Sequence, residues 1–192
     1  MLKSVHCCAV AILSLLGLLA AASGGLADEG AAAHKLAILQ SVDRDAARWI
    51  SVSKAIWDAA ETSYREVKSS AMLAAEMRQA GFQVETNLGG VPNSFVASWG
   101  SGKPVIAILG EYDALPGLFQ EAVAEKKPTG TVGAGHGCGH NLLGAAAAFA
   151  AVQARDYARD RGLNGTIRFY GCPAEENGAG KIFLLQIGRA HV

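Results

Sequence analysis

The sequence predicts an α/β fold, in which helices lie on the faces of a layered sheet. Apolar residues recur at helical spacing over roughly 35–60 and 69–80, and again from His140 to about Arg161. Short apolar runs flanked by glycine and other turn residues lie between and after these segments and are typical of strands. The expected strands are 82–86, 94–99, 105–109 and 166–170. Helices that alternate with strands in this order favour a layered sheet of one domain.

Individual residues suggest how these elements begin and end. The strand 105–109 reads VIAIL without a polar residue, which favours a strand buried on both faces. Gly100-Ser101-Gly102 predicts a tight turn before it, and a loop rich in Pro, Lys, Gly and Thr is expected over 114–135. Asn141 is a plausible N-cap for the third helix. Gly178-Ala179-Gly180 is expected to open a last helix.

Composition bounds the class of protein. The chain has 192 residues, a formal net charge of +0 and 51% hydrophobic residues, which suits one domain with a substantial core. Lys and Arg are not clustered, and nucleic-acid binding needs a clustered basic surface. We therefore expect a small-molecule substrate and no nucleic-acid partner.

The first 27 residues resemble a secretory signal peptide. Lys3 provides a positive charge, 7–22 is an apolar run, and Gly25-Leu26-Ala27 has the small residues of a cleavage site. A membrane anchor is the alternative, although the run is shorter than the ~20 residues that a spanning helix needs. We therefore expect export, to the periplasm, which would leave only Cys138 and Cys172 in the mature chain. A disulfide between these two cysteines would compete with metal binding.

The last six residues stand apart from the rest. Residues 187–192 read IGRAHV, which looks like the translation of a sequencing adapter. We therefore expect the domain to cover 28–186 and the gene to continue, and His191 is not counted as a ligand.

Polar side chains follow or precede the expected strands and helices at three places. Glu111 and Asp113 follow the strand 105–109, Glu175 and Glu176 follow the strand 166–170, and Cys138 and His140 precede the third helix. Ligands of open α/β sheets gather beyond the carboxyl ends of the strands. If the two strands are parallel neighbours, all six side chains meet at one edge of the sheet.

Cys138 and His140 are two residues apart, so in an extended segment they point the same way. A thiolate and an imidazole on one side are two metal ligands. Two alternatives remain open: a buried Cys and a satisfied His beside a glycine turn, or a thiol nucleophile with His140 as its base.

Glu175 and Glu176 are adjacent and diverge, so one can bind a metal while the other accepts a proton from a water that the metal has acidified. Asp113 is placed to orient a ligand. Glu111 is a weak ligand, a capping residue or a surface carboxylate.

Three motifs, GEYDALPGL, GHGCGHNLLG and RFYGCPAEENGAGK, resemble the family of di-metal amidohydrolases and metallopeptidases that includes aminoacylases and carboxypeptidase G. The resemblance covers about 35–186. It implies the N-terminal part of a zinc-exopeptidase-like catalytic domain, a mixed sheet with helices on both faces, and two divalent metal ions, Zn or Mn. The implied reaction hydrolyses the amide between an acyl or aroyl group and an amino acid, as in p-aminobenzoyl-glutamate.

The resemblance also implies a role for each site residue. Cys138, as a bridging ligand, His140 and Glu176 would hold metal, Glu175 would be the general base, and Asp113 would support the site. The wider family has a His where Glu111 stands.

The family's remaining histidine ligands and a lid domain for dimerisation come later in its members. We therefore expect the 192-residue chain alone to bind metal weakly and to be inactive, and the full-length form to be a homo- or hetero-dimer. A non-catalytic binding relative is the alternative, against which the intact Glu175-Glu176 pair argues.

Overall fold

The computed structural model describes residues 5–130 and 132–186 and divides into two compact units at the Arg44–Asp45 boundary. Helix α1 (Val5–Ala59) begins in the first unit and ends in the second. The apolar spacing predicts that this helix begins near residue 35, but it begins earlier, at Val5. The segment before residue 35 is rich in Ala and Leu, which favour helix, and so it continues the helix. The proposed adapter residues 187–192 and the first four residues lie outside the described part of the chain. Within that part, no helix combines the length and the apolar composition that crossing a membrane requires.

The second unit is built on a mixed four-stranded sheet, as the sequence predicts. Its order is β1 (Gln83–Thr86), β2 (Phe95–Ser101), β6 (Gly165–Cys172), β3 (Val105–Glu111). β2 runs antiparallel to β1 and to β6, whereas β3 runs parallel to β6. Glu111 pairs with Cys172 at the carboxyl ends of β3 and β6, so the segments that follow both strands leave the same edge of the sheet. The polar residues that follow β3 and β6 can converge only if these two strands are parallel neighbours, as they are.

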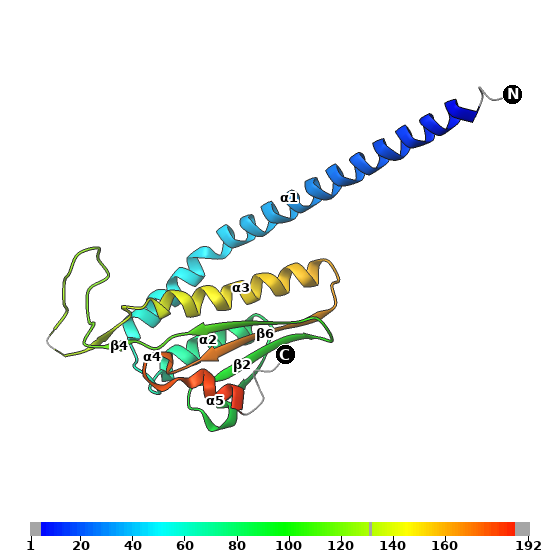
Figure 1. Cartoon of the computed structure of the whole chain (residues 1–192). Helices are drawn as coiled ribbons and strands as arrows, with labels where there is room; N and C mark the ends of the chain where they lie inside the picture. The colour runs from blue at the N-terminus through cyan, green and yellow to red at the C-terminus, as the bar shows by residue number, and fades with distance from the viewer. Residues whose placement is uncertain (1–4, 131, 187–192) are drawn as a thin grey trace. The chain divides into compact units, whose positions relative to one another are not determined.

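Helices cover both faces of this sheet (Figure 1). The larger core cluster lies between one face and three helices: the end of α1, α2 (Val67–Gln79) and α3 (His140–Asp160). A smaller cluster lies on the other face, below η1 (Leu88–Gly90) and α5 (Gly180–Gln186). Side chains alternate along the strands accordingly: Phe169 points into the first cluster and Tyr170 into the second.

The expectation that 105–109 is buried on both faces is wrong. β3 lies at the edge of the sheet, and Ile106 and Leu109 are 51% and 47% exposed. A continuous apolar run does not distinguish a central strand from an edge strand when a helix covers only part of each face.

The helices α3 and α5 begin where the sequence predicts, but the N-cap of α3 and the segment before α5 differ from the prediction. α3 begins at His140 after Gly139, which adopts φ +83° as its N-cap, so Asn141 is not the cap. The Asn141 side-chain amide instead donates to the Ser53 hydroxyl, 3.1 Å away. A short helix that the sequence did not indicate, α4 (Glu175–Gly178), precedes α5.

Two glycines let α3 pack directly on the end of β3. A Cβ atom on Gly144 would lie 2.5 Å from the Glu111 carbonyl oxygen, and one on Gly110 would lie 3.3 Å from the Gly144 Cα atom. Glycine at these positions therefore permits a close approach of the two backbones, which a Cβ on Gly144 would block. His140 lies one turn before Gly144 in α3, so this contact brings its imidazole beside the residues that follow β3.

We predict that Gly144→Ala destabilises the second unit by up to about 2 kcal/mol, because overpacking costs about 1–3 kcal/mol and the gain in helix propensity recovers only about 1. Urea denaturation followed by circular dichroism would measure it. Gly30→Ala is the matched control, since a Cβ there meets no atom within 4 Å. Equal stability of the two variants would contradict the close packing.

Candidate metal centre

The buried imidazole of His140 is held by Asp113. Its Nδ1 lies 2.9 Å from Asp113 Oδ1 and 3.1 Å from the Asp113 carbonyl oxygen. Both partners are acceptors, so Nδ1 carries a proton and donates. Nε2, which faces the acidic groups, is therefore the ring nitrogen that remains for a metal ion. A carboxylate that fixes the tautomer in this way is the usual companion of a metal-binding histidine.

Three carboxylates surround Nε2 of His140. Glu111 Oε2 is 3.0 Å away, and one oxygen each of Glu175 and Glu176 is 3.9 Å away. The other Glu111 oxygen forms an ion pair with Lys181 of α5. The glutamates come from the ends of β3 and β6, so the expected convergence at one edge of the sheet is observed.

Cys138 completes a set of possible ligands. Its Sγ, a ring nitrogen of His140 and a carboxylate oxygen of Glu176 all lie within 4.8 Å of one another. Bonds of about 2.0–2.3 Å to tetrahedral Zn²⁺ would place such atoms roughly 3.5 Å apart, so a small contraction would close the set around an ion. Glu176 Oε1 is buried without a hydrogen-bond partner, which a cation would correct. These residues therefore fit a divalent metal.

A second set consists of Glu111, His140 and Glu175, again with ligand atoms within 4.8 Å of one another. The two sets share His140, whose Nδ1 is already bonded to Asp113. Nε2 can serve only one ion at a time. If two ions bind, one of the pair must therefore depend on carboxylates, a bridging ligand or other residues.

The turn that presents Glu175 and Glu176 is held by two other carboxylates. Asp113 Oδ2 accepts the Glu176 backbone N–H at 2.9 Å, and Glu66 Oε1 accepts the Ala174 backbone N–H at 2.7 Å. Ala174 adopts φ +56°, which is unusual for a residue other than glycine. Glu66 is fully buried, and burial, followed in smaller part by the charge of Asp113, raises its pKa.

The thiol groups have raised pKa values. A hydrogen bond with Glu176, and then the charge of that residue, raises the pKa of the exposed Cys138 thiol in the metal-free protein. Burial raises the pKa of Cys172 to about 12. Both cysteines are free, so the disulfide considered from the sequence is not formed. A catalytic thiol needs a lowered pKa, so these surroundings do not favour Cys138 as a nucleophile.

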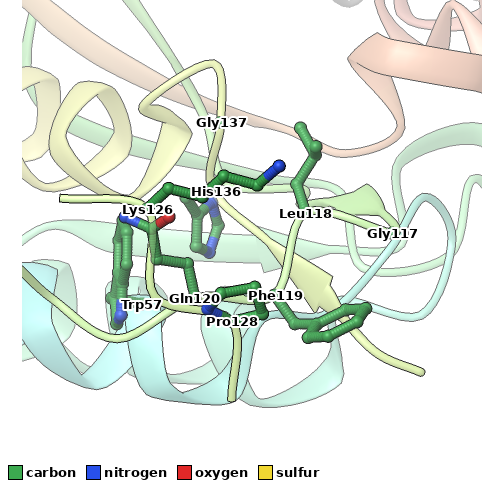
Figure 2. Close-up of a pocket in the computed structure, with 9 residues that line it drawn as sticks. All are labelled: Trp57, Gly117, Leu118, Phe119, Gln120, Lys126, Pro128, His136 and Gly137. Carbon is green, nitrogen blue, oxygen red and sulfur yellow. The ribbon is translucent and has the colours of Figure 1, made fainter. Parts of the chain in front are cut away.

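A cavity of about 290 Å³ is lined in part by Gly137, which precedes Cys138 in the chain (Figure 2). Trp57, Leu118, Phe119 and Pro128 give it apolar walls, and Gln120, Lys126 and His136 add polar groups. Gly137 lets the loop approach closely, because a Cβ there would lie 2.4 Å from Leu118 Cδ1. Strands β4 (Leu115–Pro116) and β5 (Ala134–Gly135) pair at the base of this loop.

The structure thus brings all five residues that the sequence singled out to one place: Cys138, His140, Glu176, Glu175 and Asp113. Glu111, for which the sequence allows several roles, lies among them. Three contributors were missed: Glu66, Lys181 and Ser63, whose hydroxyl donates to Asp113 Oδ2 at 3.0 Å. Lys181 ends the motif RFYGCPAEENGAGK, but its partner Glu111 lies 70 residues earlier. No local pattern marks Glu66 or Ser63, because each is far along the chain from its partner.

Comparisons with known proteins point to metallohydrolases. The chain is 48% identical over 149 residues to a subunit of the p-aminobenzoyl-glutamate hydrolase of Escherichia coli, covering 77% of this chain and 31% of that protein. It is 31% identical to the mouse Xaa-Arg dipeptidase, covering 78% of this chain and 34% of that protein. No family model matches the chain.

Among solved structures, a dinuclear metal binding peptidase of the M20 family from Bacillus subtilis superposes with a TM-score of 0.63 at 25% identity, covering 76% of this chain and 40% of that one. The chain spans about a third of the length of the curated relatives it matches.

In the metal-free protein, we predict that Cys138 is alkylated with a pH midpoint above that of an ordinary thiol, because Glu176 raises its pKa. Glu176→Gln removes the charge and should lower the midpoint. Mass spectrometry of the peptide containing Cys138, after iodoacetamide treatment in the presence of a chelator, would measure it. A midpoint that Glu176→Gln leaves unchanged would contradict the contact.

Proposed function

Because the chain belongs to the M20 family of dinuclear metallopeptidases and amidohydrolases, we propose that the whole protein hydrolyses the amide between an acyl or aroyl group and an amino acid. One observation carries this proposal for the chain's own residues: Cys138 and His140 from one segment, and Glu176 from another, present ligand atoms within 4.8 Å of one another. The name of the bacterial relative supports p-aminobenzoyl-glutamate, or a compound like it, as the substrate.

We assign Cys138, His140 and Glu176 to metal binding, with Asp113 fixing the imidazole. The set has one thiolate and several carboxylates, which suits Zn²⁺ or Mn²⁺. Divalent cations, when bound, polarise a substrate carbonyl and make water more acidic. A second ion near Glu111 and Glu175 would have to compete with the Lys181 ammonium group for Glu111.

Glu175 is our candidate for the general base. Its side chain is 40% exposed, against 16% for Glu176, so it reaches solvent while staying 3.9 Å from His140 Nε2. A carboxylate there would take a proton from the attacking water and deliver it to the nitrogen of the leaving amino acid.

The cavity that Gly137 lines in part is our candidate for the acyl-group site. Its apolar walls include the flat surfaces of Trp57 and Phe119, which suit an aromatic acyl group. Faster hydrolysis of N-benzoyl than of N-acetyl amino acids by the whole protein would support this placement.

Two further features of the whole protein remain proposals. The relative from Escherichia coli is named as a subunit, which supports a homo- or hetero-dimer. Residues 1–27 have the sequence of an export signal, which supports a periplasmic location.

We predict that the exported protein begins at Asp28, because the small residues Gly25-Leu26-Ala27 precede it. Amino-terminal sequencing of protein from the periplasmic fraction would measure this. An intact Met1 on protein that stays with the membrane fraction would favour the anchor instead.

We predict that Glu175→Gln in the whole protein keeps its metal and loses turnover by about 10²- to 10⁴-fold, the usual contribution of a general base. Metal analysis and an assay with p-aminobenzoyl-glutamate would measure both. Glu125→Gln, at an exposed position of the loop, is the control. Removal of metal by a chelator should abolish activity, and readdition should restore it.

Full activity after chelation would instead favour the thiol hydrolase. A Glu175→Gln variant that remains active would refute the assignment of the base but not that of the metal site.

A further inference from the structure

Glu66 is a buried carboxylate for which hydrolysis has no direct use. It lies at the start of α2, its side chain is fully buried, and it is far along the chain from the turn it contacts. Its Oε1 accepts the Ala174 N–H at 2.7 Å and its Oε2 lies 3.4 Å from the Asn93 amide nitrogen. Both partners are donors, so the hydrogen bonds suit two acceptor oxygens.

Glu66 connects four segments of the second unit. The Asn93 amide also donates to the Tyr64 carbonyl at 3.2 Å, and the Asn93 carbonyl accepts the Tyr112 hydroxyl at 2.6 Å. Tyr112 directly follows β3, and Ala174 follows β6. The carboxylate therefore stands behind the edge of the sheet where the candidate ligands gather.

Ala174 is the pivot of the turn that presents Glu175 and Glu176. Its N–H goes to Glu66, and its carbonyl accepts the Gly178 N–H at 3.0 Å. A left-handed conformation at alanine is maintained only where its surroundings hold it. Pro173, which precedes Ala174, has no N–H, so the Ala174 N–H is the one backbone donor that these two residues can offer to Glu66.

We propose that Glu66 is a positioning residue for the metal centre: by accepting the Ala174 N–H it sets the turn that aims Glu176 at the ion, a role that rests on the proposed metal function. This role depends on an acceptor oxygen 2.7 Å from the Ala174 nitrogen more than on the negative charge of Glu66. Glu66 touches neither the metal nor the substrate in this role.

The variants Glu66→Gln, Glu66→Asp and Glu66→Ala separate these two properties. Glutamine keeps an oxygen that can accept the Ala174 N–H. If the Asn93 amide rotates, its oxygen can accept a hydrogen bond from the new glutamine side-chain nitrogen. Aspartate keeps the charge but withdraws the oxygen by one methylene group. Alanine removes both.

The test is Co²⁺ binding by the purified whole protein, followed by thiolate-to-metal charge-transfer absorption from Cys138. We expect Glu66→Asp and Glu66→Ala to weaken affinity roughly 10- to 100-fold, the range for residues that support a ligand indirectly, and Glu66→Gln to stay within a few-fold of the parent. At saturating Co²⁺ the absorption should return in every variant, because Cys138 and His140 belong to another segment.

Glu61→Ala is the matched control. The Glu61 carboxylate accepts the Ser69 backbone N–H at 2.9 Å and so caps the same helix, α2, away from the turn. The Glu61→Ala variant should have a lower urea midpoint of unfolding and an unchanged affinity for Co²⁺. If Glu66→Ala does not fold, the order of Gln above Asp in affinity still tests the proposal.

Each other result is informative. An affinity in Glu66→Asp equal to or above that in Glu66→Gln, or a loss in Glu61→Ala as large as that in the Glu66 variants, would overturn the role of Glu66 alone. A parent whole protein that binds no Co²⁺ would overturn the metal centre and this role with it.

Discussion

The carboxylate of Asp113 is the contact on which the candidate centre depends. It is buried, and it accepts hydrogen bonds from three segments: the His140 imidazole, the Ser63 hydroxyl and the Glu176 backbone N–H. One oxygen fixes which nitrogen of His140 faces the site, and the other fixes the turn that carries Glu176. A single side chain thus sets the geometry of two candidate ligands, which come from α3 and from the segment after β6.

This arrangement concentrates negative charge. Glu111, Asp113, Glu175 and Glu176 surround one imidazole, and Lys181 forms an ion pair with Glu111. Buried like charges destabilise a fold unless cations or hydrogen bonds offset them. A divalent cation held by these residues would offset the repulsion directly, so metal binding and the stability of this edge of the sheet are thermodynamically linked.

The sequence was sufficient for the parts of the site that local patterns encode. Two apolar strands followed by acidic residues predict convergence if the strands are parallel, which β3 and β6 are. Cys138 and His140 do lie together, but not in the extended segment that the spacing argument assumes, because Gly139 is left-handed and His140 begins α3. The sequence was insufficient where the outcome depends on distant packing. The position of β3 at the sheet edge, and the bond from Glu66 to Ala174, involve partners far along the chain. No window of sequence contains both sides of such a contact.

The two halves of the centre are held by different forces. The backbone of His140 is placed by steric fit, since glycines at 110 and 144 allow α3 to rest on β3, and Asp113 then orients its ring. The backbone that carries Glu176 is placed by hydrogen bonds alone: the Ala174 and Glu176 N–H groups donate to carboxylates on either side of Glu175. The turn therefore holds Glu176 inward and leaves Glu175 more exposed. A ligand must stay fixed while a base must reach water and the leaving nitrogen, so the same turn separates the two tasks between adjacent residues.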